Sequence, residues 1–174
     1  FSQKPLSGWE LSKLGCEVAA RASANMVFSS VQGGMMGALG IGLPDVPIFL
    51  AAVFKTLFEI SLSFGYPYDT KQEQTYQMLL ICAAVGEEAE RKQAAVDANI
   101  VAQQIRMGAG ICSVSFEETK QRASKALCDA ALMGKMVQGA PIIGVYGGFR
   151  NGVLLKQIGT VAAVKYQQRM LRER

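Results

Sequence analysis

One stretch, residues 44–66, constrains the fold of this chain most, because it is long, almost wholly apolar and bounded by helix-stopping residues. Asp45 can accept hydrogen bonds from the first free N–H groups of a helix, and Pro47 falls in the first turn, where a missing N–H does no harm. Gly65 can adopt the left-handed conformation that ends many helices, and Pro67 stops the helix from continuing. We therefore expect a buried central helix here.

The rest of the chain also repeats its apolar residues at helical spacing, while the alternating pattern of strands is scarce. Residues 8–31 predict an early helix, and Thr70 and Ser115 each begin a sequence with the spacing of a capping box. A last helix is expected from about Asn151 to the end. The sequence predicts one all-α domain over residues 1–174, a bundle of about five to seven helices.

The segment 87–107 is the most polar of the expected helices, so we place it on the outside of the bundle. Its apolar seam is thin and consists of Val96, Ile100 and Met107, with Ala95 and Val101 beside them.

Two glycine-rich apolar tracts predict close packing of helices. Gly33 and Gly37 are spaced by four, and so are Gly144, Gly148 and Gly152, so that each set falls on one helical face. Small residues at this spacing let two helix backbones approach closely. The alternative is that the two tracts form one surface that dips into a bilayer.

Charge is low overall and unevenly placed. Charged residues make up 18% of the chain, against roughly 25% in typical soluble domains. The net charge is +4, and residues 150–174 carry six basic side chains against one acidic. This composition leaves part of the surface available for lipid, a partner or a second copy, and it does not predict nucleic-acid binding.

Histidine is absent, which excludes His-based general base catalysis and zinc sites that need imidazole. The four cysteines are widely separated, and no two of them form a Cys-x-x-Cys motif. We therefore expect buried thiols in a reducing compartment. We see neither a signal peptide nor a membrane-spanning segment. No cofactor or metal is expected, and the predicted location is cytoplasmic, at the inner face of the membrane.

Lys55 and Glu59 are the first candidate site residues, since both fall on the otherwise apolar helix at 44–66. The simpler interpretation is a structural ion pair inside the bundle, because buried charges are normally paired. The alternative is a ligand site at the mouth of an apolar cleft, able to hold an anionic head group. We include Asp45 and Asn151 in this hypothetical ligand site.

The basic last helix is the second candidate. Lys165, Arg169 and Arg172 fall near one face, with Lys156 nearby. A charged face that is simply solvated is the ordinary interpretation. The functional interpretation is docking on anionic lipid, where each basic residue contributes about 1 kcal/mol.

Three stretches together resemble the EcsC protein family: 43–47, 54–66 and 141–151 with the helix behind it. In that family a basic residue and a Glu spaced by four, here Lys55 and Glu59, precede a Gly-Tyr or Gly-Phe end. A Pro-x-x-Gly tract then precedes an Asn and a closing helix that ends in Tyr and Arg. Tyr166 and Arg169 fill those last places here.

The resemblance implies a helical, membrane-associated bacterial protein, with an ABC transporter as a possible partner. We therefore expect a non-catalytic protein that associates peripherally with a membrane or a membrane protein. One alternative is a soluble bundle that binds a lipid-like or anionic amphipathic ligand near Lys55 and Glu59. A second alternative is a hydrolase with an unfamiliar site, although no residue set in the sequence specifies a reaction.

Overall fold

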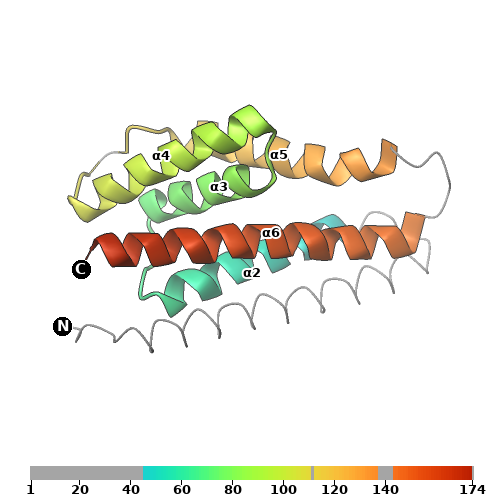
Figure 1. Cartoon of the computed structure of the whole chain (residues 1–174), viewed down its shortest axis with the longest axis horizontal. Helices are drawn as coiled ribbons and strands as arrows, with labels where there is room; N and C mark the ends of the chain where they lie inside the picture. The colour runs from blue at the N-terminus through green and yellow to red at the C-terminus, as the bar shows by residue number, and fades with distance from the viewer. Residues whose placement is uncertain (1–44, 111, 137–142, 174) are drawn as a thin grey trace.

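The computed structural model describes residues 45–110, 112–136 and 143–173, and every regular element in these ranges is an α-helix (Figure 1). The described helices are α2 (Asp45–Ser63), α3 (Lys71–Val85), α4 (Glu88–Arg106), α5 (Phe116–Met136) and α6 (Ile143–Arg172). The predicted all-α fold is confirmed. The predicted helix at 8–31 and the packing of Gly33 and Gly37 lie outside the described residues.

Helix α6 is the longest described element and organises the others along its length. Its 30 residues extend about 45 Å at the usual rise of an α-helix. Helices α3, α4 and α5 lie on one side of it in Figure 1, and α2 lies on the other side. Helix α3 packs against α4, α5 and α6, while α2 packs against α6.

Helix α2 is the helix predicted at 44–66, and it ends as the sequence indicates. Gly65 has a φ of 81°, in the left-handed region that favours glycine. The N–H of Tyr66 donates to the carbonyl of Ser61 at 3.0 Å, and the N–H of Gly65 donates to the carbonyl of Leu62 at 3.0 Å. These two bonds form a Schellman motif and satisfy the last carbonyl groups of the helix.

The charged pair of α2 is not buried, contrary to the expectation of an ion pair inside the bundle. The Lys55 and Glu59 side chains are 61% and 34% exposed, and their charged atoms lie 3.9 Å apart. The apolar row of α2 that includes Val53, Leu57 and Ile60 takes the inward side, which leaves this pair at the surface. An exposed pair of this kind contributes about 1 kcal/mol at most.

Helix α3 is covered on nearly all sides. Leu79, Leu80 and Ile81 are consecutive, about 100° apart around the helix, and all three are fully buried. Among the described elements α3 therefore lies nearest the centre of the bundle. Its start was predicted correctly, because the Thr70 hydroxyl accepts the N–H of Glu73 at 3.2 Å.

Glu73 does not complete the predicted capping box. Its carboxylate lies inside the bundle, where Arg169 of α6 donates from Nη1 to Oε2 at 2.8 Å and Tyr166 donates its hydroxyl hydrogen to Oε1 at 2.6 Å. The Glu73 and Arg169 side chains are only 1% and 5% exposed. A buried carboxylate needs such partners, because an unpaired charge in the interior is strongly destabilising.

Aromatic rings surround this buried pair. The guanidinium carbon of Arg169 lies 4.0 Å from the ring centre of Tyr66 and 5.3 Å from that of Tyr76. Tyr166 packs edge-on against Tyr76, with ring centres 5.2 Å apart. Burial is the main reason that the pKa values of Tyr66, Tyr76 and Tyr166 lie above their usual value.

Helix α4 lies on the outside of the bundle as predicted, and its apolar seam is only partly buried. Val96 and Ile100 are 52% and 42% exposed. The fully buried positions are Ala94, Ala98 and Val101. Small side chains take the inward row because they let α4 approach α3 closely. Met107, the third residue of the expected seam, follows α4 and is also exposed.

A second group of ion pairs connects α4 to α5. Arg122 of α5 donates from Nε to Glu90 at 2.9 Å and from Nη1 to Asp97 at 3.0 Å. Asp97 is buried and also accepts a hydrogen bond from Gln93 at 2.8 Å. One arginine therefore compensates two carboxylates of the neighbouring helix.

Helix α6 begins at Ile143, well before the predicted start near Asn151. Gly144, Gly148 and Gly152 all fall within the helix, and Gly152 is buried. Each glycine weakens an isolated helix by about 1 kcal/mol. Tertiary packing can override that preference.

The cysteines differ in their surroundings. Cys82 is fully buried, and burial raises the pKa of its thiol to about 12. Cys128 is exposed, contrary to the expectation of buried thiols, while Cys16 lies outside the described residues.

The buried pair gives a test of the fold. Arg169→Met should lower the free energy of unfolding by about 3–5 kcal/mol, because it leaves the Glu73 carboxylate buried without its cation. Urea unfolding followed by circular dichroism measures the loss. Adding Glu73→Gln to this variant should recover part of it. Glu88→Gln, which breaks an exposed pair with Lys92, is the control. A loss of similar size in the control would contradict the conclusion that the Glu73–Arg169 pair is buried and stabilises the fold.

The buried tyrosines predict a loss of stability at high pH. Below about pH 10 tyrosine is neutral in both states, so this contribution to stability is fully present. Above that pH the unfolded chain releases protons that buried Tyr76 retains, so the free energy of unfolding falls. Tyr76→Phe should reduce this slope by about 1.4 kcal/mol per pH unit. Unfolding at a series of alkaline pH values measures the slope.

Tyr68→Phe is the matched control, because the Tyr68 side chain is exposed. An equal reduction of the slope in this control would mean that the burial of Tyr76 is not the cause. Equal slopes for Tyr76→Phe and the unmodified chain would contradict the burial of Tyr76.

Candidate functional site: a basic cleft between α4 and α6

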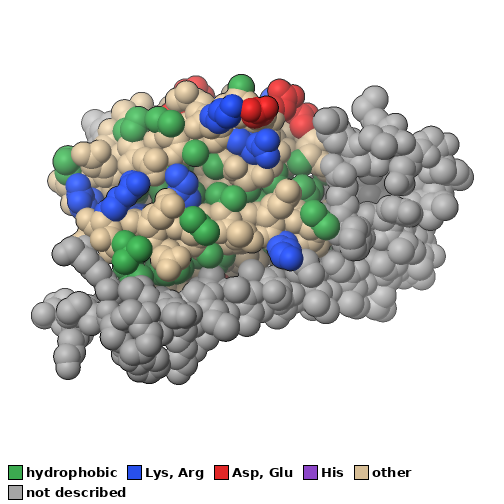
Figure 2. All heavy atoms as spheres, viewed as in Figure 1, with side chains coloured by type: hydrophobic (Ala, Val, Ile, Leu, Met, Phe, Trp, Pro, Cys, Tyr) green, Lys and Arg blue, Asp and Glu red, His purple; other side chains and the backbone are tan. Residues whose placement is uncertain are grey.

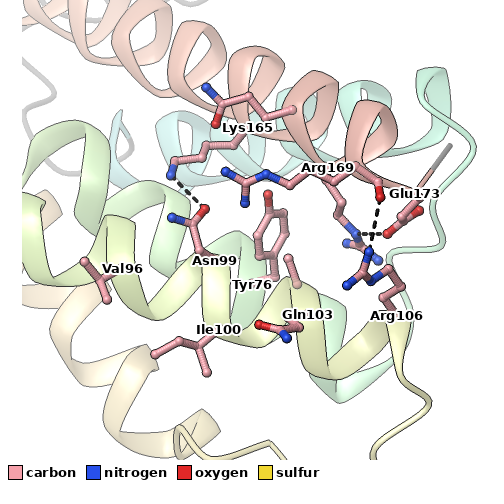
Figure 3. Close-up of a pocket in the computed structure, with 12 residues that line it drawn as sticks. Tyr76, Val96, Asn99, Ile100, Gln103, Arg106, Lys165, Arg169 and Glu173 are labelled. Carbon is pink, nitrogen blue, oxygen red and sulfur yellow. Dashed lines mark hydrogen bonds and ion pairs between the residues drawn. The ribbon is translucent and has the colours of Figure 1, made fainter.

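An open cleft of about 450 Å³ lies between α4 and the C-terminal part of α6, with Tyr76 of α3 also in its lining (Figure 3). Its basic lining residues are Arg106 from α4 and Lys165, Arg169 and Arg172 from α6. Basic side chains also gather along the seam between these two helices in the space-filling view (Figure 2). Four basic side chains therefore line this one cleft.

The guanidinium of Arg169 is already paired with carboxylates of the protein. It forms the buried ion pair with Glu73 and also donates from Nε to Glu173 Oε1 at 3.1 Å. Glu173, the carboxylate that lines the cleft, accepts a further hydrogen bond from the Tyr66 hydroxyl at 2.7 Å. The sequence-based placement of Arg169 on a docking surface is therefore wrong, because its guanidinium is buried.

Lys165 has a different environment, although it lies only one turn before Arg169. Its ammonium donates to the carbonyl of Ala95 at 3.3 Å. It also donates to the side-chain oxygen of Asn99 at 3.2 Å (Figure 3). Both acceptors are neutral. Partial burial and the positive charge of Arg172 lower the pKa of Lys165. Among the described residues, no carboxylate compensates this ammonium.

Arg106 and Arg172 lie where α4 and α6 end. Arg106 donates from Nη1 to the backbone carbonyl of Arg172 at 3.1 Å. A cation at this position stabilises the negative end of a helix dipole. Both side chains are exposed, so their charges remain in contact with solvent.

Exposed apolar side chains lie beside these cations. Val96 and Ile100 are spaced by four on α4, so they share one face of the helix, and both line the cleft. The amides of Asn99, Gln103 and Gln168 supply additional polar groups to the lining. The cleft thus combines positive charge, hydrogen-bond donors and an apolar edge, which are the features of a site for an anionic amphipathic molecule.

The sequence-predicted site residues are only partly brought together. Lys165 and Arg172 line the cleft. Lys156 is exposed on α6, but nine residues before Lys165 places it about half a turn away around the helix. Lys55 and Glu59 form their exposed pair on α2 and are not part of the cleft lining.

Asn151 and Asp45, the other two residues of the expected ligand site, add no support for that site. Asn151 is partly buried within α6 and has an interaction of its own, and it is not part of the cleft lining. The side chain of Asp45 lies outside the described residues.

Sequence reasoning missed Arg106 and Asn99, as well as the exposure of Val96 and Ile100. One signal was present: the segment 87–107 carries two apolar rows, and only one of them can face the core. Of the expected seam, Val101 is buried together with Ala94 and Ala98, whereas Val96 and Ile100 are exposed.

Within residues 45–110, 112–136 and 143–173, no three His, Cys, Asp or Glu side chains are grouped as metal ligands would be. The helices of the same ranges include none with the length and apolar character needed to cross a bilayer.

Comparison with known proteins agrees with the resemblance noted in the sequence. The EcsC protein family matches residues 2–171, nearly the whole chain. No curated protein and no solved structure matches it. The chain therefore belongs to the EcsC protein family.

Proposed function

We propose that this protein is non-catalytic and associates peripherally with an anionic membrane surface, at the inner face of the membrane, through the face of α4 and α6 that carries the cleft. The observation that supports this proposal most is the combination of uncompensated cations with exposed apolar side chains on that face. Lys165 has only neutral hydrogen-bond partners among the described residues, and Val96 and Ile100 lie exposed beside it.

The charges on this face suit reversible docking. Arg106, Lys165 and Arg172 each contribute about 1 kcal/mol near an anionic leaflet, and the attraction weakens as salt screens it. The contribution of three cations, about 3 kcal/mol, would be too small for permanent attachment. Contact of Val96 and Ile100 with the lipid interface would add a hydrophobic contribution to the binding free energy, which salt does not weaken.

Vesicle binding tests the charged part of the proposal. Co-sedimentation at low salt should show binding to phosphatidylcholine vesicles that contain phosphatidylserine and little binding to phosphatidylcholine alone. Replacing Arg106, Lys165 and Arg172 together by Gln should weaken binding on the order of a hundredfold, at about 1 kcal/mol for each charge.

The matched control replaces Lys92, Lys120 and Lys125 by Gln. These lysines are exposed on α4 and α5, outside the cleft lining, and the control changes the net charge by the same amount. An equal loss of binding in the control would mean that net charge alone is responsible. Binding of the protein to a membrane protein, such as a transporter, in vesicles where lipid alone does not bind would also contradict the proposal.

The apolar part makes a separate prediction. Val96→Asn with Ile100→Asn should leave the fold intact, because both side chains are exposed, and should remove most of the binding that persists at high salt. Leu62→Asn is the control, since Leu62 is an exposed apolar residue of α2. Co-sedimentation at high salt measures the effect. Unchanged binding of the double variant would exclude this face as the one that meets lipid.

A further inference from the structure

We propose that the cleft between α4 and α6 is a binding site for a phosphate monoester group, held by Lys165 and Arg172, with the apolar neck of the same molecule against Val96 and Ile100. This inference rests on the proposed function and deepens it. A membrane surface attracts cations through its overall charge, whereas this site would select one kind of head group.

The position of Lys165 is the first argument. An ammonium has three N–H donors, and Lys165 uses two of them on the carbonyl of Ala95 and the side chain of Asn99. These bonds fix the ammonium at the wall of the cleft without neutralising it. A lysine that is partly buried and held by neutral acceptors is costly to the fold, and a bound anion would remove that cost.

The second argument is that the positive charges of Lys165 and Arg172 lie close to each other. Arg172 lies close enough to Lys165 for its positive charge to lower the pKa of that ammonium. Residues 165, 168 and 172 follow a spacing of three and four, so Gln168 shares the face of these two cations. An anion bound between Lys165 and Arg172 would replace their repulsion by two attractions.

The other charged residues of the cleft leave the space between Lys165 and Arg172 available for an anion. Glu173 is engaged by Arg169 and by the Tyr66 hydroxyl, and Arg169 is compensated by Glu73. Arg106 uses one N–H on the carbonyl of Arg172, and a guanidinium has five donors in total. Within the described part of the chain, Lys165, Arg172 and Arg106 are therefore the basic residues of the cleft that have no ion pair with a carboxylate.

The chemistry of these groups favours a phosphate monoester. Such a group carries about 1.5 to 2 negative charges at neutral pH and three acceptor oxygens. A carboxylate or a phosphodiester carries one charge and fewer oxygens that can accept. Lysine and arginine donors beside side-chain amides match the larger number of acceptors. The volume of about 450 Å³ holds a phosphate together with a small polar unit such as glycerol.

The apolar edge indicates what is attached to the phosphate. Val96 and Ile100 are exposed beside the cations, and contact with the first carbons of an acyl chain would cover them. This favours a lipid monoester with its phosphate in the cleft over a free phosphate.

The experiment compares vesicles that contain phosphatidic acid with vesicles that contain phosphatidylserine, adjusted to equal measured surface potential. We expect about tenfold tighter binding to phosphatidic acid, equivalent to about 1.4 kcal/mol. Lys165→Gln and Arg172→Gln should each abolish this preference. Lys156→Gln should retain it, because it removes the same charge from another side of α6. Equal binding to both vesicles, or a preference that survives Lys165→Gln, would overturn the inference.

A soluble probe separates this inference from the proposed function. Glycerol 3-phosphate titrated into the protein by calorimetry should bind saturably, and Lys165→Gln should remove the binding. If phosphatidylserine and phosphatidic acid vesicles bind equally and the soluble probe does not bind, the site is wrong and membrane docking stands. If the soluble probe binds through Lys165 and no vesicle binds, the phosphate site stands and membrane docking is wrong.

Discussion

The ion pair between Glu73 and Arg169 is the interaction on which the arrangement of the described helices most depends. It joins α3, which contacts three other helices, to the end of α6, and the two residues are 96 positions apart in the chain. Tyr66, from the turn after α2, lies against the same guanidinium. Three segments therefore meet at one charged group. Such a group is stable inside a bundle only while all of its partners are in place.

Several residues that carry the resemblance to the family meet at this buried pair. Gly65 and Tyr66 end α2, while Tyr166 and Arg169 lie near the end of α6, and the structure brings Tyr66, Tyr166 and Arg169 together around Glu73. These three residues therefore contribute to the contacts that hold α2, α3 and α6 together. The residues proposed to meet a ligand, Lys165 and Arg172, are outside the motif quoted for the family.

Local features of the fold were predictable from the sequence, and distant pairings were not. The end of α2 follows from Gly65, because a left-handed residue and its hydrogen bonds depend on neighbours within one turn. The partner of Glu73 is nearly a hundred residues away, so its capping position suggested a local role that the side chain does not have. Lys165 and Arg169 differ by only about 40° around α6. Which of them is buried depends on where Glu73 lies, and no pattern within α6 contains that information.

Neighbouring positions of α6 have different roles within the same turns. Arg169 and Tyr166 point into the bundle, while Lys165 and Arg172 line the cleft. Substitutions of Lys165 and Arg172 leave the buried contacts of Tyr166 and Arg169 with Glu73 in place. The scaffold is in this sense open to changes of specificity, because the more exposed positions of a single helix can diversify while its buried positions keep the chain folded.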